Sequence, residues 1–261
     1  MELKYTLLGL FVYTAMALYA VAAILFAVRA RRAAWIMYAA GCAAAAAGWV
    51  WRWDDAGHVP LQNLFEVCLT LGVLVFPLTL FGRRFLDVGA EVGDAVIGLL
   101  VLFPVGFVFS GEPKPMMPAL QSVLFVPHVA AYMVAYVVMG KAGCLALGVM
   151  VRQGDRRLRA ERDTHVVARF GFPLLTLGLV LGAVWGKLAW SDYWNWDPKE
   201  LWSLASWLVF LGYLHFRYLN GRRYPRANAL LVLLGLLAIV LTLLWVNFGR
   251  LFSGGLHSYA T

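Results

Sequence analysis

Residues Trp185–Trp207 read WGKLAWSDYWNWDPKELWSLASW, a run in which tryptophan recurs every few residues. The segment joins two apolar runs, residues 170–184 and 201–216, where a chain leaves and re-enters a bilayer. Tryptophan favours membrane interfaces, because one edge of its ring is polar and the rest is apolar. An ordinary aromatic belt does not need a proline and polar residues interleaved among the rings, as they are at Asn195, Asp197, Pro198, Lys199 and Glu200. The pattern therefore predicts an aromatic platform for a large, flat, hydrophobic ligand.

The composition indicates a membrane protein. The chain is 62% hydrophobic and only 14% charged, whereas a soluble protein of this length needs far more charge to cover its surface. Apolar runs close to the length of one bilayer crossing recur along it. We therefore predict an all-α polytopic membrane protein, folded as a single transmembrane helical bundle over residues 1–261. Its eight helices are expected at residues 5–28, 34–52, 62–81, 90–110, 126–150, 169–189, 200–219 and 228–248.

Lysine and arginine set the expected orientation. They concentrate after the first, third, fifth and seventh predicted helices, at Arg29, Arg31, Arg32, Arg83, Arg84, Arg152, Arg156, Arg157, Arg159, Arg162, Arg169, Arg217, Arg222, Arg223 and Arg226. The opposite side carries Lys4, Arg52, Lys114, Lys187, Lys199 and Arg250. Because these residues accumulate on the cytoplasmic side, both termini and the Trp-rich segment, residues 185–207, are predicted on the outer side. The expected location is the inner (plasma) membrane of the cell, with the active face outside the cytoplasm.

Charge and cysteine content exclude other classes of protein. The net charge of +8 sits in short loops, where it reports membrane topology and not a nucleic-acid partner. Cys42, Cys68 and Cys144 fall inside apolar runs, and the chain has no Cys-x-x-Cys pair. Neither thiol redox chemistry nor a zinc site is therefore expected. The basic segment 152–168 is expected to be a solvated cytoplasmic loop that contains a solvated His165.

Three histidines belong to the predicted outer face, namely His58, His128 and His257. A neutral imidazole is the commonest metal ligand near physiological pH, although a lone histidine at a helix end is more often structural. His128 and His257 flank the Trp-rich segment in the sequence, and the predicted topology puts both on its side of the membrane. His58 is expected to order its own loop or a neighbouring carboxylate.

His215 is a histidine inside a predicted membrane helix. At ~1.5 Å rise per residue it lies roughly 22 Å from the outer end of the seventh helix, in the inner leaflet. Ionisable residues at such positions are costly and usually functional. The alternative is a side chain that reaches the inner interface near Arg217.

Several polar residues are expected to support the Trp-rich segment. Asn63 and Glu66 share one face at the outer start of the third helix. Either can hydrogen-bond a neighbouring helix, and Asn63 can also contact an acidic group of a ligand, while Glu66 is expected to pair with a cation. Asp197 directly before Pro198 is the pattern of a capped helix start. The carboxylates are therefore expected to fix the loop and not to touch the ligand.

The Trp-rich segment resembles the WWD signature of the haem-handling proteins of cytochrome c biogenesis. The resemblance is carried by Trp185-Gly186, Trp190, Tyr193-Trp194-Asn195-Trp196-Asp197-Pro198-Lys199-Glu200 and Trp202. Three further segments match, namely Gly57 to Glu66, His128 with Tyr132 and Tyr136, and Gly255 to Tyr259. From about residue 57 to the end, the chain is most similar to the CcsA (ResC) family of the two-component System II pathway.

The resemblance implies haem b as both substrate and bound ligand. His128 and His257 match the histidines that the CcsA family uses as axial ligands of the haem iron, so they are the expected catalytic pair. His215 matches the family's transmembrane haem histidine and is a third expected iron ligand. The residues expected to contact the rest of the haem are Trp185, Trp190, Trp194, Trp196 and Asn63.

The resemblance also implies a function and partners. The chain is expected to be a subunit of a System II cytochrome c synthase, a haem lyase that moves haem across the membrane. It would present haem to the Cys-x-x-Cys-His segment of apocytochrome c for thioether formation, and a CcsB (ResB) membrane subunit is the expected partner. The alternative is a haem transporter or chaperone that delivers haem without catalysing attachment. Co-expression with the partner and an apocytochrome, scored for covalent haem, distinguishes the two.

Overall fold

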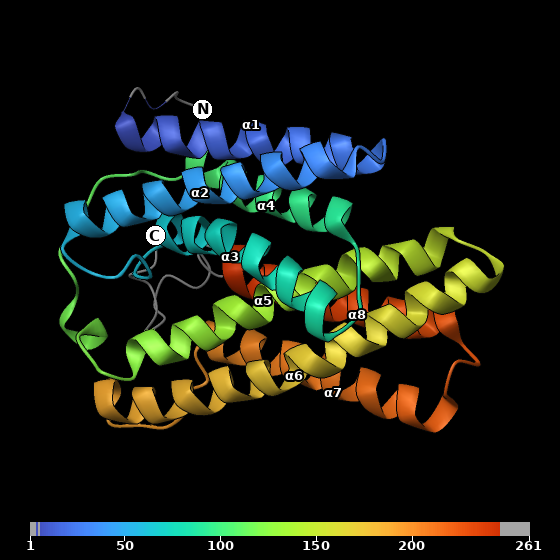
Figure 1. The fold of residues 1–261 in the computed structure, drawn as a ribbon. Coiled ribbons are helices and arrows are strands. Elements are labelled where there is room, and N and C mark those ends of the chain that lie inside the picture. Colours follow the sequence, from blue (N-terminus) through green and yellow to red (C-terminus); the bar gives the residue numbers. More distant parts are fainter. Residues whose placement is uncertain (1–3, 5, 246–261) are drawn as a thin grey trace. The chain divides into compact units, whose positions relative to one another are not determined.

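The computed structural model describes Lys4 and residues 6–245, which are helical over most of their length. The chain divides into two compact units, Met1–Pro118 and Ala119–Thr261. The elements, coloured along the sequence in Figure 1, are α1 (Leu7–Ala27), α2 (Arg31–Ala56), α3 (Leu64–Phe85), α4 (Glu91–Phe107), the 3-10 turn η1 (Pro118–Leu120), α5 (Phe125–Val151), α6 (Gly154–Trp190), α7 (Pro198–Asn220), α8 (Pro225–Val240) and the π-helical turn η2 (Leu241–Trp245).

The predicted helical architecture is confirmed over the described residues, where eight α-helices and no strand occur. Six segments are long and apolar enough to cross a membrane, namely α1, α2, α3, α5, α6 and Pro225–Leu244. Helix α4 has only 17 residues, and α7 opens with the charged pair Lys199 and Glu200. The chain is thus a multi-pass helical membrane protein. Eight crossings with both termini outside stay a prediction.

The first unit is held together by tight packing around Tyr19 of α1. Helix α1 packs against α2 and α4, and α3 packs against the same two helices. The Tyr19 hydroxyl donates to the carbonyl oxygen of Gly72 at 2.8 Å. A Cβ atom at Gly41 or Gly98 would lie 2.7 or 2.6 Å from the Tyr19 ring. Glycines on α2 and α4 therefore make room for one buried aromatic ring.

A buried ion pair joins α2 to the first turn of α3. The Arg52 and Glu66 side chains are both 0% exposed, with Nη2 and Oε1 2.8 Å apart. Arg52 Nη1 also donates to the Gly111 carbonyl at 2.6 Å. The backbone N–H of Gln62 donates to Oε2 of Glu66 at 2.8 Å. The prediction that Glu66 pairs with a cation is confirmed. The second helix is predicted to end at Arg52, whereas α2 continues to Ala56 and Arg52 is buried.

A second cation shares the surroundings of this pair. The Lys4 ammonium lies 4.4 Å from the centre of the Phe65 ring and donates to the Val105 carbonyl at 2.7 Å. Burial, and secondly the positive charge of Arg52, lower the pKa of Lys4 to about 8. The Glu66 carboxylate therefore offsets a locally positive environment.

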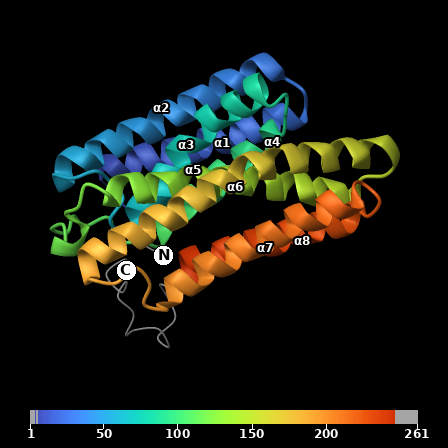
Figure 2. The same cartoon turned by 90° about the horizontal axis from the view of Figure 1, so that it is seen from below.

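The second unit contains α5 to α8, which run lengthwise beside one another in Figure 2. Helix α5 packs against α6 and α8, and α7 packs against α6 and α8. Glycines on α6 face α5: a Cβ atom at Gly171 would lie 2.9 Å from Val138 Cγ1, and one at Gly178 would lie 2.9 Å from the Tyr132 ring. These glycines allow the two helices to approach closely.

The prediction of a solvated loop over residues 152–168 is wrong. Helix α6 begins at Gly154 and has 37 residues, about 55 Å at ~1.5 Å rise per residue. Because the hydrocarbon core is only ~30 Å thick, α6 is longer than one crossing requires, and its first part is the segment predicted to be a loop. That part buries Ala160, Glu161, Thr164, Val167 and Ala168, a spacing that puts them on one helical face. The basic segment is therefore a packed helical extension.

A polar cluster fixes this extension to α7 and α8. Glu161 is only 1% exposed; its Oε1 accepts from Arg217 Nε at 2.5 Å and from Asn228 Nδ2 at 2.9 Å. One turn further on, His165 Nδ1 lies 3.2 Å from the Tyr213 hydroxyl. The expectation of a solvated His165 is thus also wrong, because the extension packs that face of α6 against α7.

The ion pair of the first unit gives a stability prediction. Glu66→Gln leaves the Arg52 charge buried without a carboxylate, and breaking such a pair costs about 3–5 kcal/mol. We expect a marked fall in the thermal unfolding temperature of the purified protein. The control is Glu91→Gln, which breaks the exposed pair of Arg83 and Glu91, whose atoms lie 3.0 Å apart. Exposed pairs contribute about 1 kcal/mol or less, so equal losses in the two variants would contradict the assigned role of burial.

Candidate haem-binding site

His128 lies near the start of α5, and its ring is held by α6. Its Nδ1 atom is 2.9 Å from the carbonyl oxygen of Gly178. A carbonyl oxygen can only accept a hydrogen bond, so Nδ1 carries the proton and Nε2 of the neutral ring has the lone pair. Metal-binding histidines commonly show this arrangement, in which one ring nitrogen donates to a carbonyl and the other binds the metal. The geometry therefore suits ligation of a metal through His128 Nε2.

Aromatic rings fix the plane of this imidazole. The His128 ring stacks on Trp185 with ring centres 5.6 Å apart and an interplanar angle of 19°, and Tyr132 meets it edge-on at 5.3 Å. The Trp185 indole N–H donates to the Ala119 carbonyl at 3.2 Å, and Trp190 packs against Trp185 at 4.7 Å. Trp185 is only 2% exposed, so it is a packed part of the cluster that supports one face of the His128 ring.

Glycines on α6 make room for this cluster. A Cβ atom at Gly182 would lie 2.6 Å from Cε1 of His128, and one at Gly186 would lie 3.3 Å from the Asp192 carbonyl oxygen. With Gly178, these residues recur every fourth position and so share one face of α6. Gly178 and Gly182 are not predicted from the sequence as residues of the site. Their spacing of four residues nevertheless indicates a helix face that can approach a neighbouring helix closely.

Within the Trp-rich segment, a capping box marks the start of α7. Asp197 is the N-cap residue, and its Oδ1 accepts from the backbone N–H of Lys199 at 2.8 Å. Pro198 occupies the first turn, and the Glu200 side chain accepts from the backbone of Asp197. The predicted cap at Asp197 and Pro198 is confirmed.

Glu200 also determines the backbone around Trp196. Its Oε2 accepts from the amides of Asn195 at 2.8 Å and Asp197 at 3.2 Å, on either side of Trp196. Trp196 has φ +56°, in the left-handed region that costs a residue with a Cβ roughly 1–2 kcal/mol. The carboxylate therefore holds a strained tryptophan in place, which is consistent with the expectation that the acidic residues organise this loop.

The loop between α6 and α7, residues 191–197, exposes aromatic side chains. Trp194 and Trp196 pack edge to face with centres 6.0 Å apart, and Trp196 remains 66% exposed. Tyr193 is 60% exposed. The Trp194 indole nitrogen is buried and has no hydrogen-bond partner within the described part of the chain. The loop thus combines exposed ring faces with an indole N–H donor, features that suit a large flat ligand with acidic substituents.

His215 repeats the hydrogen-bonding pattern of His128. Its side chain is exposed on α7, and Nδ1 lies 2.9 Å from the Leu211 carbonyl oxygen. By the same argument, Nε2 has the lone pair in the neutral ring. The ring bonds back toward the N-terminal end of α7, whereas Arg217 bonds Glu161.

The remaining site candidates are His58, Asn63 and His257. Both ring nitrogens of His58 face backbone carbonyls of two loops in the first unit, an ordering role that agrees with the expectation. Asn63 caps α3 through its side-chain oxygen, which accepts from the Glu66 amide at 3.0 Å. His257 lies outside the described residues. Within Lys4 and residues 6–245, no group of three or more His, Cys, Asp or Glu side chains could hold a metal ion.

Fold and site together define a class of protein: a multi-pass helical membrane protein with a histidine set against tryptophans beside an aromatic loop. An axial imidazole and flat apolar walls are what a metal-centred macrocycle requires, whereas a bare metal ion needs a cluster of several ligands.

The comparisons agree with this class. Residues 11–252 match the Cytochrome C assembly protein family. The cytochrome c biogenesis protein CcsA of Prochlorococcus marinus is 31% identical over 80% of this chain and 78% of its own length. CcsA of Guillardia theta is 32% identical over 80% of this chain and 79% of its own. The chain therefore belongs to the CcsA family of cytochrome c biogenesis proteins.

A solved structure supports the fold alone. The cytochrome c haem lyase CcmF aligns with a TM-score of 0.72 at 21% identity. The alignment covers 93% of this chain and 48% of the CcmF chain, so this chain spans about half the length of that protein.

The glycine contact on α6 gives a prediction for the site. Gly182→Ala puts a methyl group 2.6 Å from Cε1 of His128, so the imidazole must leave its bond to Gly178. We expect weaker haem binding and an altered visible spectrum, with the fold retained. The control is Gly212→Ala on α7, where a Cβ atom meets nothing within 4 Å. Unchanged haem binding in both variants would contradict the placement of His128.

Proposed function

We propose that this chain is the haem-handling and attachment subunit of a System II cytochrome c synthase. In this proposal it acts with a CcsB (ResB) membrane subunit, and its active face lies outside the cytoplasm. The observation that carries the proposal is the setting of His128, whose Nδ1 faces the Gly178 carbonyl and whose ring stacks on Trp185. That setting orients Nε2 for an iron ligand, and membership of the CcsA family supports haem as the iron-bearing group.

The proposed outer site holds haem b between His128 and His257. Two imidazoles on opposite faces keep the iron six-coordinate and protect it from adventitious ligands. Trp190, Trp194 and Trp196 would line the ring, while the buried Trp185 would orient His128. The propionates suit hydrogen-bond donors such as the Trp194 indole N–H.

Asn63 is a further proposed contact of the haem propionates. Its side-chain oxygen is occupied by the α3 cap. Its amide nitrogen can only donate, which matches a carboxylate. Glu66, by contrast, is neutralised by Arg52 and has no proposed contact with haem.

The proposed reaction adds two cysteine thiols of apocytochrome c across the two haem vinyl groups. In each addition a carbon–sulphur bond forms at the vinyl carbon next to the ring, and the thiol proton ends on the outer vinyl carbon. The vinyl chemistry belongs to haem, so the protein contributes placement and exclusion of competing ligands. One histidine must leave the iron when the client's own histidine replaces it.

The proposed inner site uses His215, where haem would bind on its way from the cytoplasm. The His215 side chain is exposed, so a haem bound there would lie against the exposed face of α7. The Nδ1 bond to the Leu211 carbonyl gives its ring the tautomer suited to an iron ligand.

The outer site is tested by co-expressing the chain with CcsB and an apocytochrome c in cells without their own maturation system. We expect His128→Ala and His257→Ala each to abolish covalent haem attachment, while the protein still folds and inserts. The control is His58→Gln, which should retain attachment because His58 contacts loop carbonyls. Haem binding without covalent attachment by the wild type would favour the transporter or chaperone alternative. Wild-type attachment in both variants would remove the two histidines from the mechanism.

The inner site is tested by His215→Gly. We expect less haem in the purified protein, because the variant lacks an axial ligand, and partial recovery when imidazole is added to the growth medium. Imidazole can fill the vacated ligand position, whereas it cannot repair a packing defect. Full haem loading in His215→Gly without imidazole would show that His215 is an ordinary surface side chain of α7.

A further inference from the structure

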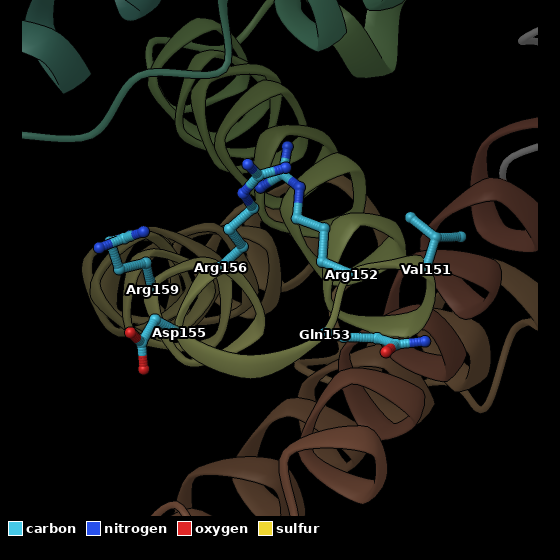
Figure 3. Close-up of a pocket in the computed structure, with 6 residues that line it drawn as sticks. All are labelled: Val151, Arg152, Gln153, Asp155, Arg156 and Arg159. Carbon is cyan, nitrogen blue, oxygen red and sulfur yellow. The ribbon is translucent and has the colours of Figure 1, made fainter.

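An open pocket of about 580 Å³ lies at the turn between α5 and α6 (Figure 3). It is lined by Val151, Arg152, Gln153, Asp155, Arg156 and Arg159. Figure 3 shows the side chains of Arg152 and Arg156 pointing toward one another, whereas the Asp155 carboxylate points away from them. Three arginines and a single carboxylate thus line this pocket, and the guanidinium groups of Arg152 and Arg156 lie together in it.

The positive charge of the pocket is not neutralised by the chain. None of these three arginines forms an ion pair with a carboxylate anywhere in the described residues. The acidic neighbours on α6 are engaged elsewhere, because Glu161 bonds Arg217 and Asp163 lies 3.9 Å from Arg162. Like charges held close together repel, so an external anion would stabilise this arrangement.

Exposed apolar side chains adjoin the arginines. Val151 is 80% exposed and Leu147, one turn earlier on α5, is 55% exposed. Leu158 on α6 is 40% exposed. Helix α5 is long and apolar enough to cross a membrane, so apolar and basic side chains meet near its end. That combination is typical of the boundary between lipid tails and headgroups.

We infer that this pocket binds the phosphodiester headgroup of an anionic phospholipid, with Arg152, Arg156 and Arg159 on the phosphate oxygens. Guanidinium groups bind phosphate through paired hydrogen bonds. The acyl chains would lie along Leu147 and Val151. Such a site does not depend on the haem-handling function, and it would anchor the extension of α6 at the membrane surface. By the distribution of arginine, that surface is the cytoplasmic one.

The test uses the full chain, delipidated in a neutral detergent and titrated with a fluorescent phosphatidylglycerol. We expect saturable binding that phosphatidylcholine does not match, and about a hundredfold loss of affinity in the triple variant R152Q/R156Q/R159Q. The control triple variant R29Q/R31Q/R32Q removes the same charge from other exposed arginines and should bind like the wild type. Unchanged thermal unfolding temperatures of both triple variants would show that the loss of lipid affinity comes from the pocket and not from a destabilised fold.

Three outcomes would overturn the inference. Equal losses in the two triple variants would mean general attraction to a basic surface. Displacement of the lipid by inorganic phosphate would indicate a site for free anions. Displacement by haem at equal concentration would indicate a haem-binding surface instead.

Discussion

The hydrogen bond between His128 Nδ1 and the Gly178 carbonyl is the contact on which the proposed chemistry depends. It joins α5 to α6 and assigns the ring proton at the same time. The bond requires the two helices to approach closely, which the glycines of α6 permit, because a Cβ atom at Gly182 would overlap the imidazole. Trp185 then limits rotation of the ring by stacking on it. The packing of α5 on α6 therefore determines both the tautomer of His128 and the direction in which its Nε2 atom points.

The loop before α7 follows the same principle of fixing aromatic groups through polar contacts. Glu200 binds the two amides that flank Trp196 and so maintains its left-handed backbone. An exposed indole held in this way loses little conformational freedom on binding a flat ligand, which favours affinity. The acidic residues of the Trp-rich segment thus act on the loop backbone, and the tryptophans present the surface.

Much of this structure is readable from the sequence because its signals are local. Apolar runs predict the helices, and Asp197 with Pro198 predicts the start of α7, since a cap depends on adjacent residues. The errors concern residues whose environment is set by distant partners. The extension of α6 looks like a solvated loop because arginines dominate it, but Glu161 is neutralised by Arg217 on another helix. Arg52 likewise resembles a charge at a helix end, and only its pairing with Glu66 explains its burial. No local pattern reports either partner.

The candidate site shows the same division. The tryptophans and histidines are evident in the sequence, whereas the direction of the His128 ring depends on Gly178, which is 50 residues away in the chain. The importance of Gly182 also follows from contact between helices. The sequence thus identifies the chemical groups of the site, and the packing of α5 on α6 orients them.

The most direct test of this account is an experimental structure of the haem-loaded protein with its partner subunit. In the proposed site the iron is bound by Nε2 of His128, while Nδ1 stays within hydrogen-bond distance of the Gly178 carbonyl and the ring remains stacked on Trp185. An iron bound through Nδ1, or a haem with no bond to His128 and an imidazole turned away from Gly178, would contradict it.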